Sequence, residues 1–318
     1  MDDLSVRIES RKQVADDIVS LELVAADGTP LPPFTAGAHI DIKLGPGLVR
    51  QYSLCNDSSE SGHYRIAVLR DPASRGGSIA VHDRLRVGDT VRISAPRNHF
   101  ALSEAPRSLL FAGGIGVTPI LAFAKELRRS NAQFELHYCA RSATKLVFRD
   151  ELAEAAGDGR AFFYLDDGGP RLDIAAVLAA HPNTTPVYVC GPGGFIDHVL
   201  GAARAAGWPE ALLRREYFAA APVSADADPD GAFDIELAKS GMRLQVPAGC
   251  TIIQVLAEHG VDIPVSCEQG VCGTCLTRVL AGEPDHRDMY LTDDEHIAND
   301  QMTPCCSRAR SACLVLDL

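Results

Sequence analysis

The chain has 318 residues, of which 46% are hydrophobic and 23% charged. This composition is typical of a globular protein, and the length suggests about two or three domains. The formal net charge of −12 argues against a nucleic-acid-binding protein, which requires a basic surface. No stretch approaches the roughly 20 apolar residues of a membrane span, and the first residues lack the apolar stretch of a signal peptide. We therefore expect a cytoplasmic protein that does not bind membranes.

The first part of the chain predicts an antiparallel barrel or sandwich, because short alternating runs such as SVRIES, HIDIKLG and YRIAVLR are separated by turns. It carries two motifs, RQYSL at Arg50–Leu54 and RGGS at Arg75–Ser78, with one helix expected after the second. Arginine, hydroxyl groups and glycine-freed N–H groups suit a phosphate, and Tyr52 offers a flat face to an aromatic ring system. Each motif alone also fits an ordinary half-buried strand or turn.

From about Arg107 the pattern changes to apolar strands that alternate with helix-like stretches, which predicts a parallel sheet. GGIGVTP at Gly113–Pro119 closes one strand and opens a helix, and CGPGGF at Cys190–Phe195 follows the last apolar strand. Two such turns would meet at the carboxyl edge of the sheet, where their glycines allow a pyrophosphate to approach a helix N-terminus. They predict a nucleotide site, although a single glycine turn also occurs without a ligand.

Small, acidic and proline-containing residues at 219–231 have the composition of a linker. After them, FDIEL and MRLQV flank a KSG turn and predict a hairpin, Thr251 to Glu258 predicts a helix, and SACLVLDL predicts a strand. The expected organisation is a β-barrel at 1–103, an α/β domain at 104–220, a linker at 221–232 and a small mixed domain at 233–318.

Three thiols within nine residues carry the most specific signal. CEQGVCGTC, from Cys267 to Cys275, has the spacing C-x4-C-x2-C, and Cys305 follows after a long gap. This three-plus-one grouping is the plant-type arrangement for a 2Fe–2S cluster. Structural zinc is the alternative, but zinc sites usually show two short-spaced pairs. Cys306 adjoins Cys305, and because neighbours in a strand point to opposite sides, only one of the two is expected to face the irons.

Two further features have plainer interpretations. Residues 233–318 contain thirteen acidic and six basic side chains, which form either a solvated surface or a docking face for a basic redox partner. None of the ten histidines falls in a pair with metal-ligand spacing beside acids, so we assign them no chemistry.

Taken together, these motifs resemble the phthalate dioxygenase reductase family, the one-chain reductases of two-component Rieske oxygenases. The resemblance covers nearly the whole chain and implies a flavin barrel, a ferredoxin reductase-like nicotinamide domain, a linker and a C-terminal β-grasp 2Fe–2S ferredoxin domain. It implies that FMN is held by Arg50, Tyr52, Ser53, Leu54, Gly77 and Ser78. It places the NADH pyrophosphate at Gly113, Gly114, Gly116 and Thr118, and the nicotinamide at Cys190, Gly191 and Pro192, with Glu216 and Phe218 closing over the flavin. It assigns the cluster to Cys267, Cys272, Cys275 and Cys305.

The implied function is an NADH-dependent reductase that passes electrons through FMN and the cluster to a terminal Rieske-type aromatic oxygenase or O-demethylase. A flavin fits between the other two groups because it exchanges electrons both singly and in pairs. A reductase for a haem-thiolate monooxygenase is the alternative, and a scaffold with a zinc-binding tail is the non-enzyme alternative. FAD in place of FMN, and NADPH in place of NADH, remain open from the residues alone. We expect a monomer.

Overall fold

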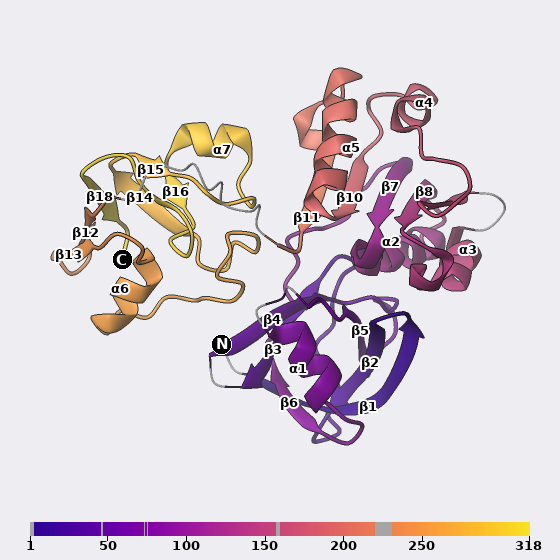
Figure 1. Ribbon diagram of the computed structural model, residues 1–318, viewed down its shortest axis with the longest axis horizontal. Helices are drawn as coiled ribbons and strands as arrows, with labels where there is room; N and C mark the ends of the chain where they lie inside the picture. The colour runs from indigo at the N-terminus through magenta and orange to yellow at the C-terminus, as the bar shows by residue number, and fades with distance from the viewer. Residues whose placement is uncertain (1–2, 46, 73, 75, 157–159, 220–230) are drawn as a thin grey trace. The chain divides into compact units, whose positions relative to one another are not determined.

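The protein is described by a computed structural model covering residues 3–45, 47–72, 74, 76–156, 160–219 and 231–318 (Figure 1). The chain forms two compact units, unit 1 (Met1–Glu216) and unit 2 (Tyr217–Leu318). The predicted linker at 221–232 lies outside the described residues except for its last two positions, and so does Arg75 of the RGGS motif.

Unit 1 begins with a closed antiparallel sheet. Its six strands run in the order β4-β3-β6-β1-β2-β5, and because the outer strands β4 and β5 also contact each other, the sheet forms a barrel. Side chains alternate between the barrel interior and solvent, as Val6 and Ile8 inside and Arg7 outside illustrate. The elements are β1 (Leu4–Ala15), β2 (Ile18–Ala25), β3 (His39–Gly45), β4 (Leu48–Ser53), β5 (Tyr64–Leu69), α1 (Gly77–Arg84) and β6 (Thr90–Ile93).

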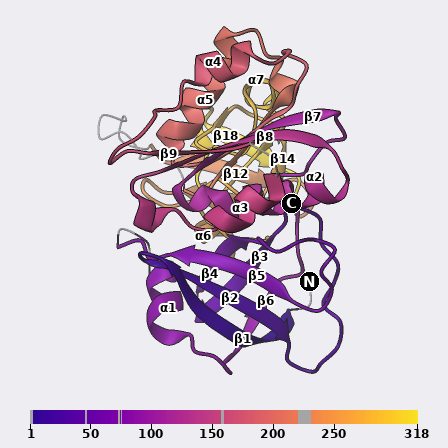
Figure 2. The same cartoon turned by 90° about the vertical axis from the view of Figure 1, so that its right-hand side faces the viewer.

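A mostly parallel sheet follows in the order β11-β10-β7-β8-β9, with α2 and α3 on one face and α4 and α5 on the other (Figure 2). The strand order reverses at β7, because β8 lies on one side of it and β10 on the other. Ligands of open α/β sheets bind at such a switch point. The elements are β7 (Arg107–Gly113), η1 (Gly114–Gly116), α2 (Val117–Arg129), β8 (Gln133–Ala140), η2 (Ala143–Lys145), α3 (Arg149–Ala156), β9 (Ala161–Leu165), α4 (Ile174–Ala179), β10 (Val187–Gly191), α5 (Gly193–Ala205), η3 (Glu210–Leu212) and β11 (Leu213–Tyr217).

The barrel and the parallel sheet share one core within unit 1. Phe100, which follows the barrel, packs its ring 5.0 Å from the ring of Phe123 on α2. At the edge of this core, Arg65 of β5 donates two hydrogen bonds of 2.9 and 2.8 Å to Glu151 of α3, and Lys125 of α2 donates a third of 2.9 Å. These contacts hold β5 of the barrel against the helices α2 and α3 that cover the parallel sheet.

Unit 2 is a β-grasp fold whose five-stranded sheet has the order β13-β12-β18-β14-β16. The predicted hairpin is β12 with β13, and β18 pairs in parallel with β12 at the centre of the sheet. Helix α6 begins with a capping box between Thr251 and Gln254. The elements are β12 (Phe233–Leu237), β13 (Met242–Val246), α6 (Ile252–Glu258), β14 (Thr277–Ala281), β15 (Pro284–Asp285), α7 (Asp293–Ala298), β16 (Gln301–Met302), β17 (Arg308–Ala309) and β18 (Cys313–Leu316).

The three predicted folds are confirmed: an antiparallel barrel, a parallel-sheet domain and a β-grasp domain. The sequence analysis missed α7 and the short pairing of β15 with β17. Among the described residues, every helix is too short or too polar to traverse a bilayer.

Candidate functional site

The first site lies where β4 meets the N-terminus of α1. Gly77, the first residue of α1, packs so closely on Arg50 of β4 that a Cβ atom at Gly77 would lie 2.3 Å from the Arg50 Cγ. Gly76 precedes it with a φ of 82°, and no described side chain caps the helix or places a carboxylate in its first turn. Arg50, whose Nη1 donates to the Val49 carbonyl at 2.7 Å, therefore packs beside the uncapped N-terminus of α1, and an arginine next to free helix N–H groups suits a phosphate.

Other predicted residues of this site have structural tasks of their own. The Ser78 hydroxyl accepts the backbone N–H of Asp71 at 3.1 Å and lies 3.0 Å from the Ser74 hydroxyl, so it shapes the loop that leads into α1. Tyr52 is half-buried against the barrel core, and desolvation raises its pKa above the usual range, so its phenol stays neutral. Leu54 has its side chain in the barrel core and donates its N–H to the Ala38 carbonyl at 2.8 Å.

A partly buried carboxyl connects the barrel to the parallel sheet. The Ser53 hydroxyl, at the end of β4, donates a 3.2 Å hydrogen bond to Glu216 of β11, although the two residues are 163 positions apart. Burial raises the pKa of Glu216 to about 8, and the hydrogen bond from Ser53 only partly offsets this effect. Burial, with Glu216 nearby, also raises the pKa of Cys190 well above its usual range. At neutral pH this junction therefore holds an uncharged carboxyl and an uncharged thiol.

The two glycine turns predicted for a nucleotide meet at the switch point. A Cβ atom at Gly116 would lie 2.4 Å from the Cys190 backbone carbonyl, and one at Gly191 would lie 2.9 Å from the Gly113 Cα. A Cβ atom at Gly113 would also lie 2.9 Å from Pro192 Cδ. Glycine is required at these positions because the loops after β7 and β10 pack backbone against backbone. This proximity exposes two rows of peptide groups to one ligand.

Gly114 and Thr118 set the backbone conformation of the glycine turn that follows β7. Gly114 has a φ of 53°, and Thr118 donates its hydroxyl to the Ile115 carbonyl at 3.1 Å within the first turn of α2. Thr118 is 2% exposed, so its side chain stabilises the turn from inside the protein and has little contact with solvent. Phe218, predicted to close over the flavin, follows β11, belongs to unit 2 and is 40% exposed.

The four predicted cluster ligands are all buried in unit 2. The Cys267 thiol hydrogen-bonds Cys272, and the Cys305 thiol hydrogen-bonds Cys275, so the distant cysteine reaches the loop. Backbone N–H groups point at sulfur: Gln269 N lies 3.3 Å from Cys267 Sγ. Four buried thiols, two of which face backbone N–H donors, fit a 2Fe–2S cluster, whose sulfurs are tuned by such hydrogen bonds.

The loop also donates to its second cysteine. Thr274 places its backbone N 3.4 Å and its hydroxyl oxygen 3.2 Å from Cys272 Sγ. The hydrogen bond from Cys267 lowers the pKa of Cys272, and the contacts from Thr274 lower it further.

Cys305 and Cys306 lie in a turn, so the expectation that they alternate along a strand is wrong. What separates them is their partners. The Cys305 thiol hydrogen-bonds both Cys275 and Cys306. The Cys306 sulfur lies 3.3 Å from the Thr303 hydroxyl and rests on Gly270, where a Cβ atom would be 2.4 Å away. This arrangement leaves Cys305 directed at the other thiols and Cys306 packed behind the loop.

A second segment supports the thiol loop from outside it. The Tyr290 ring covers Gly273, where a Cβ atom would lie 2.3 Å from Cζ, and Met289 donates its N–H to the Gly270 carbonyl at 2.9 Å. The two loop glycines have φ values of 70° and 67°. Sequence reasoning missed the role of residues 288–290, because their contact with the loop depends on the fold of the whole unit.

An anion site on a barrel, a paired glycine turn on a parallel sheet and a four-thiol loop define an oxidoreductase that connects a pyridine nucleotide to an iron–sulfur cluster through a flavin. Residues 235–310 match the model of the 2Fe–2S iron–sulfur cluster binding domain, and residues 110–200 match that of the oxidoreductase NAD-binding domain. The chain is therefore an NADH-dependent flavoprotein oxidoreductase with a 2Fe–2S cluster.

Relatives match over the full length. The vanillate O-demethylase oxidoreductase of Pseudomonas sp. (strain HR199 / DSM 7063) is 57% identical over 99% of this chain and 100% of its own length. The solved structure of phthalate dioxygenase reductase is 41% identical, with a TM-score of 0.75 over 99% of this chain and 98% of that one. An intact type IV self-sufficient cytochrome P450 monooxygenase is 39% identical, with a TM-score of 0.88 over 99% of this chain, which spans 41% of that longer protein. The chain belongs to the phthalate dioxygenase reductase family.

Proposed function

We propose that this reductase delivers electrons from NADH to a terminal Rieske-type oxygenase that acts on aromatic substrates, with O-demethylation of a methoxylated aromatic acid as the leading reaction. The observation that carries this proposal is the full-length identity of 57% to a vanillate O-demethylase oxidoreductase. The three cofactor-type sites on one chain support it, since together they supply a complete path from a two-electron donor to a one-electron carrier.

FMN is the proposed flavin, and its phosphate is assigned to Arg50, Gly77 and Ser78. The contact between Arg50 and Gly77 supports this assignment, because it holds a fixed positive charge beside the uncapped N-terminus of α1. Tyr52, Ser53 and the Leu54 carbonyl continue along the same strand and are assigned to the isoalloxazine side. Chromatography of the flavin released by heat identifies it, and FAD in that extract would contradict the assignment.

NADH is the proposed nucleotide. Its pyrophosphate is assigned to the first glycine turn and its nicotinamide to the second, with Glu216 and Phe218 beside the flavin. The residues of this assignment are Gly113, Gly114, Gly116, Thr118, Cys190, Gly191, Pro192, Glu216 and Phe218. Glu216 holds a proton and Cys190 is an uncharged thiol, so neither adds a negative charge next to an incoming hydride. The ratio of kcat/KM for NADH and NADPH tests the choice of nucleotide.

The cluster ligands are proposed to be Cys267, Cys272, Cys275 and Cys305. A bound flavin takes up electrons in pairs and releases them singly, which is the chemistry that the nucleotide and the cluster require of it. The protein's own contribution is to hold the barrel and the parallel sheet in one core, to join them through the hydrogen bond of Ser53 to Glu216, and to direct N–H groups at cysteine sulfurs.

Cys272→Ser tests this division of labour, with Cys313→Ser as a matched control from the same unit. In C272S we expect NADH to bleach the flavin absorption at the wild-type rate, while reduction of an oxygenase or of cytochrome c is lost. C313S should retain both activities. If C272S folds but NADH no longer reduces its flavin, the proposed path is wrong. A wild-type protein that is colourless and inert towards NADH would refute the proposal altogether.

A second candidate acceptor is a haem-thiolate monooxygenase, because a chain with this fold is part of a self-sufficient cytochrome P450. The two candidates are separated by reconstitution with each kind of oxygenase. The leading proposal predicts NADH-dependent release of formaldehyde from a methoxylated aromatic acid with the Rieske partner. Turnover with the P450 partner alone would favour the second candidate.

We further propose that the chain is a monomer and that its domains are 1–103, 104–220 and 233–318, joined by the linker at 221–232. Sedimentation equilibrium tests the monomer, and a dimer would contradict it. Limited proteolysis tests the linker, because cleavage should fall between unit 1 and unit 2 and should release a fragment that retains the cluster.

A further inference from the structure

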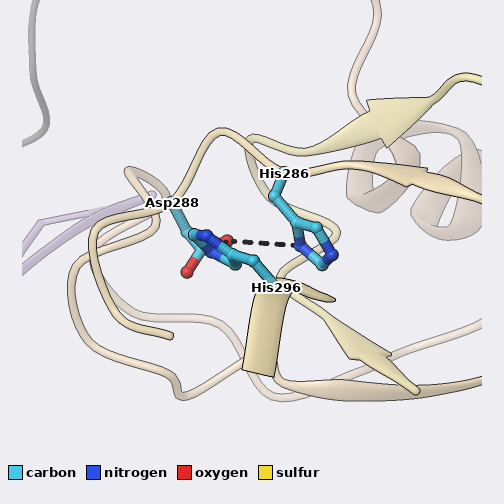
Figure 3. A group of neighbouring side chains, drawn as sticks. All are labelled: His286, Asp288 and His296. Atoms are coloured by element: carbon cyan, nitrogen blue, oxygen red, sulfur yellow. Dashed lines mark hydrogen bonds and ion pairs between the residues drawn. The ribbon is translucent and has the colours of Figure 1, made fainter. Parts of the chain in front are cut away.

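Two histidines and one aspartate gather in unit 2, outside the cysteine loop (Figure 3). His286 and Asp288 follow β15, and His296 lies on α7. One ligand atom from each residue can be chosen so that all three lie within 4.8 Å of one another. The sequence shows no recognised metal spacing here, because α7 has to fold back over the segment before the three side chains meet.

The carboxylate at the centre of this group is fully buried. One oxygen of Asp288, Oδ2, accepts the backbone N–H groups of Tyr290 and Leu291 at 3.2 and 2.8 Å. The other oxygen, Oδ1, lies 3.3 Å from Nε2 of His296 and 3.8 Å from Nδ1 of His286. A buried carboxylate requires a cation or further hydrogen-bond donors. Either a histidine proton or a metal ion beside Oδ1 can meet this requirement.

The orientation of His286 leaves a lone pair pointing at that space. Its Nε2 lies 3.1 Å from the Asn299 side-chain oxygen, which requires a proton on Nε2 and leaves Nδ1 of the neutral ring as an acceptor. His286 Nδ1 is buried and has no hydrogen-bond partner among the described residues, and the side chain is only 9% exposed. Burial, together with His296, lowers the pKa of His286, so the neutral ring is the favoured form. An acceptor nitrogen then faces an acceptor oxygen, an arrangement that a cation between them would stabilise.

We propose that His286, Asp288 and His296 bind a divalent transition-metal ion of the zinc class, at a site separate from the 2Fe–2S cluster. Imidazole nitrogen and carboxylate oxygen are ligands that zinc accepts, and a hydrogen bond to the second ring nitrogen, here from His286 to Asn299, is the usual way to orient such a ligand. Bonds of about 2.0–2.2 Å in a tetrahedron separate neighbouring ligand atoms by about 3.3 Å. The observed 3.3 and 3.8 Å are close to this spacing.

Binding requires one rearrangement. The two imidazole rings are stacked, with centroids 4.4 Å apart and planes at 23°, and parallel rings cannot direct their lone pairs at one ion. His296 has to turn, and its side chain is 27% exposed on α7, which leaves it room to do so. A proton on His296 is the competing occupant. It would satisfy Asp288 but would leave Nδ1 of His286 without a partner, whereas a metal ion satisfies all three groups.

The site is connected to the cysteine loop through Asp288. A Cβ atom at Gly270 would lie 2.8 Å from Asp288 Cβ, and Met289 donates its N–H to the Gly270 carbonyl. An ion at Asp288 would therefore tie α7 to the loop that carries the cluster ligands. We expect zinc binding to slow the loss of the cluster.

The test uses the full-length protein with its flavin and cluster in place, and zinc and cobalt as probes. Dialysis against excess zinc, then against metal-free buffer, should leave about one zinc per chain beyond the irons, measured by elemental analysis. The absorption spectrum of the cluster should not change. Cobalt at this site should give a visible spectrum without thiolate-to-cobalt charge transfer, because its ligands are nitrogen and oxygen.

Two variants and one matched control decide the assignment. His296→Asn and His286→Asn should each weaken zinc binding by more than the roughly 10- to 100-fold that loss of an outer partner costs. His259→Asn should bind zinc like the wild type, because His259 lies in the same unit but its ring hydrogen-bonds the Val255 carbonyl and is not one of the three proposed ligands. H296N keeps the test valid if H286N does not fold, since His296 is partly exposed. Zinc binding that is absent from the wild type, equal in H296N, or accompanied by cysteine-to-cobalt bands would overturn the proposal.

Discussion

Glu216→Gln should change how the stability of unit 1 depends on pH. Burial raises the pKa of this carboxyl to about 8 in the folded protein, against an ordinary value of 4.5. A raised pKa means that the folded state binds the proton more tightly than the unfolded state. The stability due to that proton is therefore fully present below pH 4.5, declines as the pH rises towards 8, and is lost above it.

The size of the effect follows from the two pKa values. Their difference of about 3.5 corresponds to about 5 kcal/mol in all, of which about 3 kcal/mol is already lost at pH 7. Glutamine can accept the same hydrogen bond from Ser53 but has no proton to lose, so E216Q avoids this loss. For a folding unit of this size, 1 kcal/mol shifts Tm by about 2–4 °C, so the difference between E216Q and the wild type should grow by about 6–12 °C between pH 4.5 and pH 7.

The measurement is thermal unfolding followed by the fluorescence of Trp208, which is the only tryptophan in the sequence and is buried in unit 1. Glu210→Gln is the control, because the hydrogen bond from Arg204 lowers the pKa of Glu210. Its ionised carboxylate therefore adds stability as the pH rises, which is the opposite of the dependence expected for Glu216. E210Q should be less stable than the wild type at pH 7 and should approach it as the pH falls. Parallel pH profiles for E216Q and the wild type would refute the reasoning about the Glu216 carboxyl.

Three further outcomes are expected. Gly77→Ala should weaken flavin binding about 10- to 150-fold in a fluorescence titration, because its Cβ would displace Arg50 and remove a charge-assisted contact of about 1.5–3 kcal/mol. Gly201→Ala should bind flavin with wild-type affinity, because no atom lies within 4 Å of a Cβ at Gly201. Equal affinities in the two variants would contradict the proposed role of Arg50 in flavin binding. Cys305→Ser should lose the cluster absorption while Cys306→Ser keeps it, and the reverse would exchange their roles. Electron transfer to a basic partner should slow at high ionic strength if the acidic residues of 233–318 form the docking face, and an unchanged rate would leave them as a solvated surface.

Local patterns predicted the elements with strong local signals. The KSG turn between FDIEL and MRLQV gave the hairpin of β12 with β13, and the run of SLLFAGG into a helical pattern gave β7, the glycine turn and α2. These segments fold as their own residues dictate, because a turn or a strand-to-helix transition is encoded within a few positions. Helix α7 was missed because half of its six residues are acidic and it shows no apolar face, although the capping box of Thr292 and Glu295 was a usable signal.

Contacts between distant segments that carry no shared motif could not be predicted from the residues. Ser53 and Glu216 meet only when β4 and β11 are both in place, and no spacing rule connects residues 163 positions apart. The same holds for His296, which reaches Asp288 only after α7 packs against its neighbours. The reasoning on Cys306 failed for a different cause: it assumed a strand, and the segment is a turn. The direction of a side chain depends on whether its residue lies in a strand, a helix or a turn, and the sequence did not show that Cys305 and Cys306 lie in a turn.

The central strand of unit 2 is also its last in the sequence. β18 at Cys313–Leu316 lies between β12 and β14, so the sheet cannot close until that segment has been synthesised. Unit 1 contains all of its own strands and can fold earlier on the ribosome. We therefore expect stable insertion of the cluster only late in biosynthesis, after unit 1 has folded. Partly made chains would lack the cluster that is proposed to pass electrons to the oxygenase.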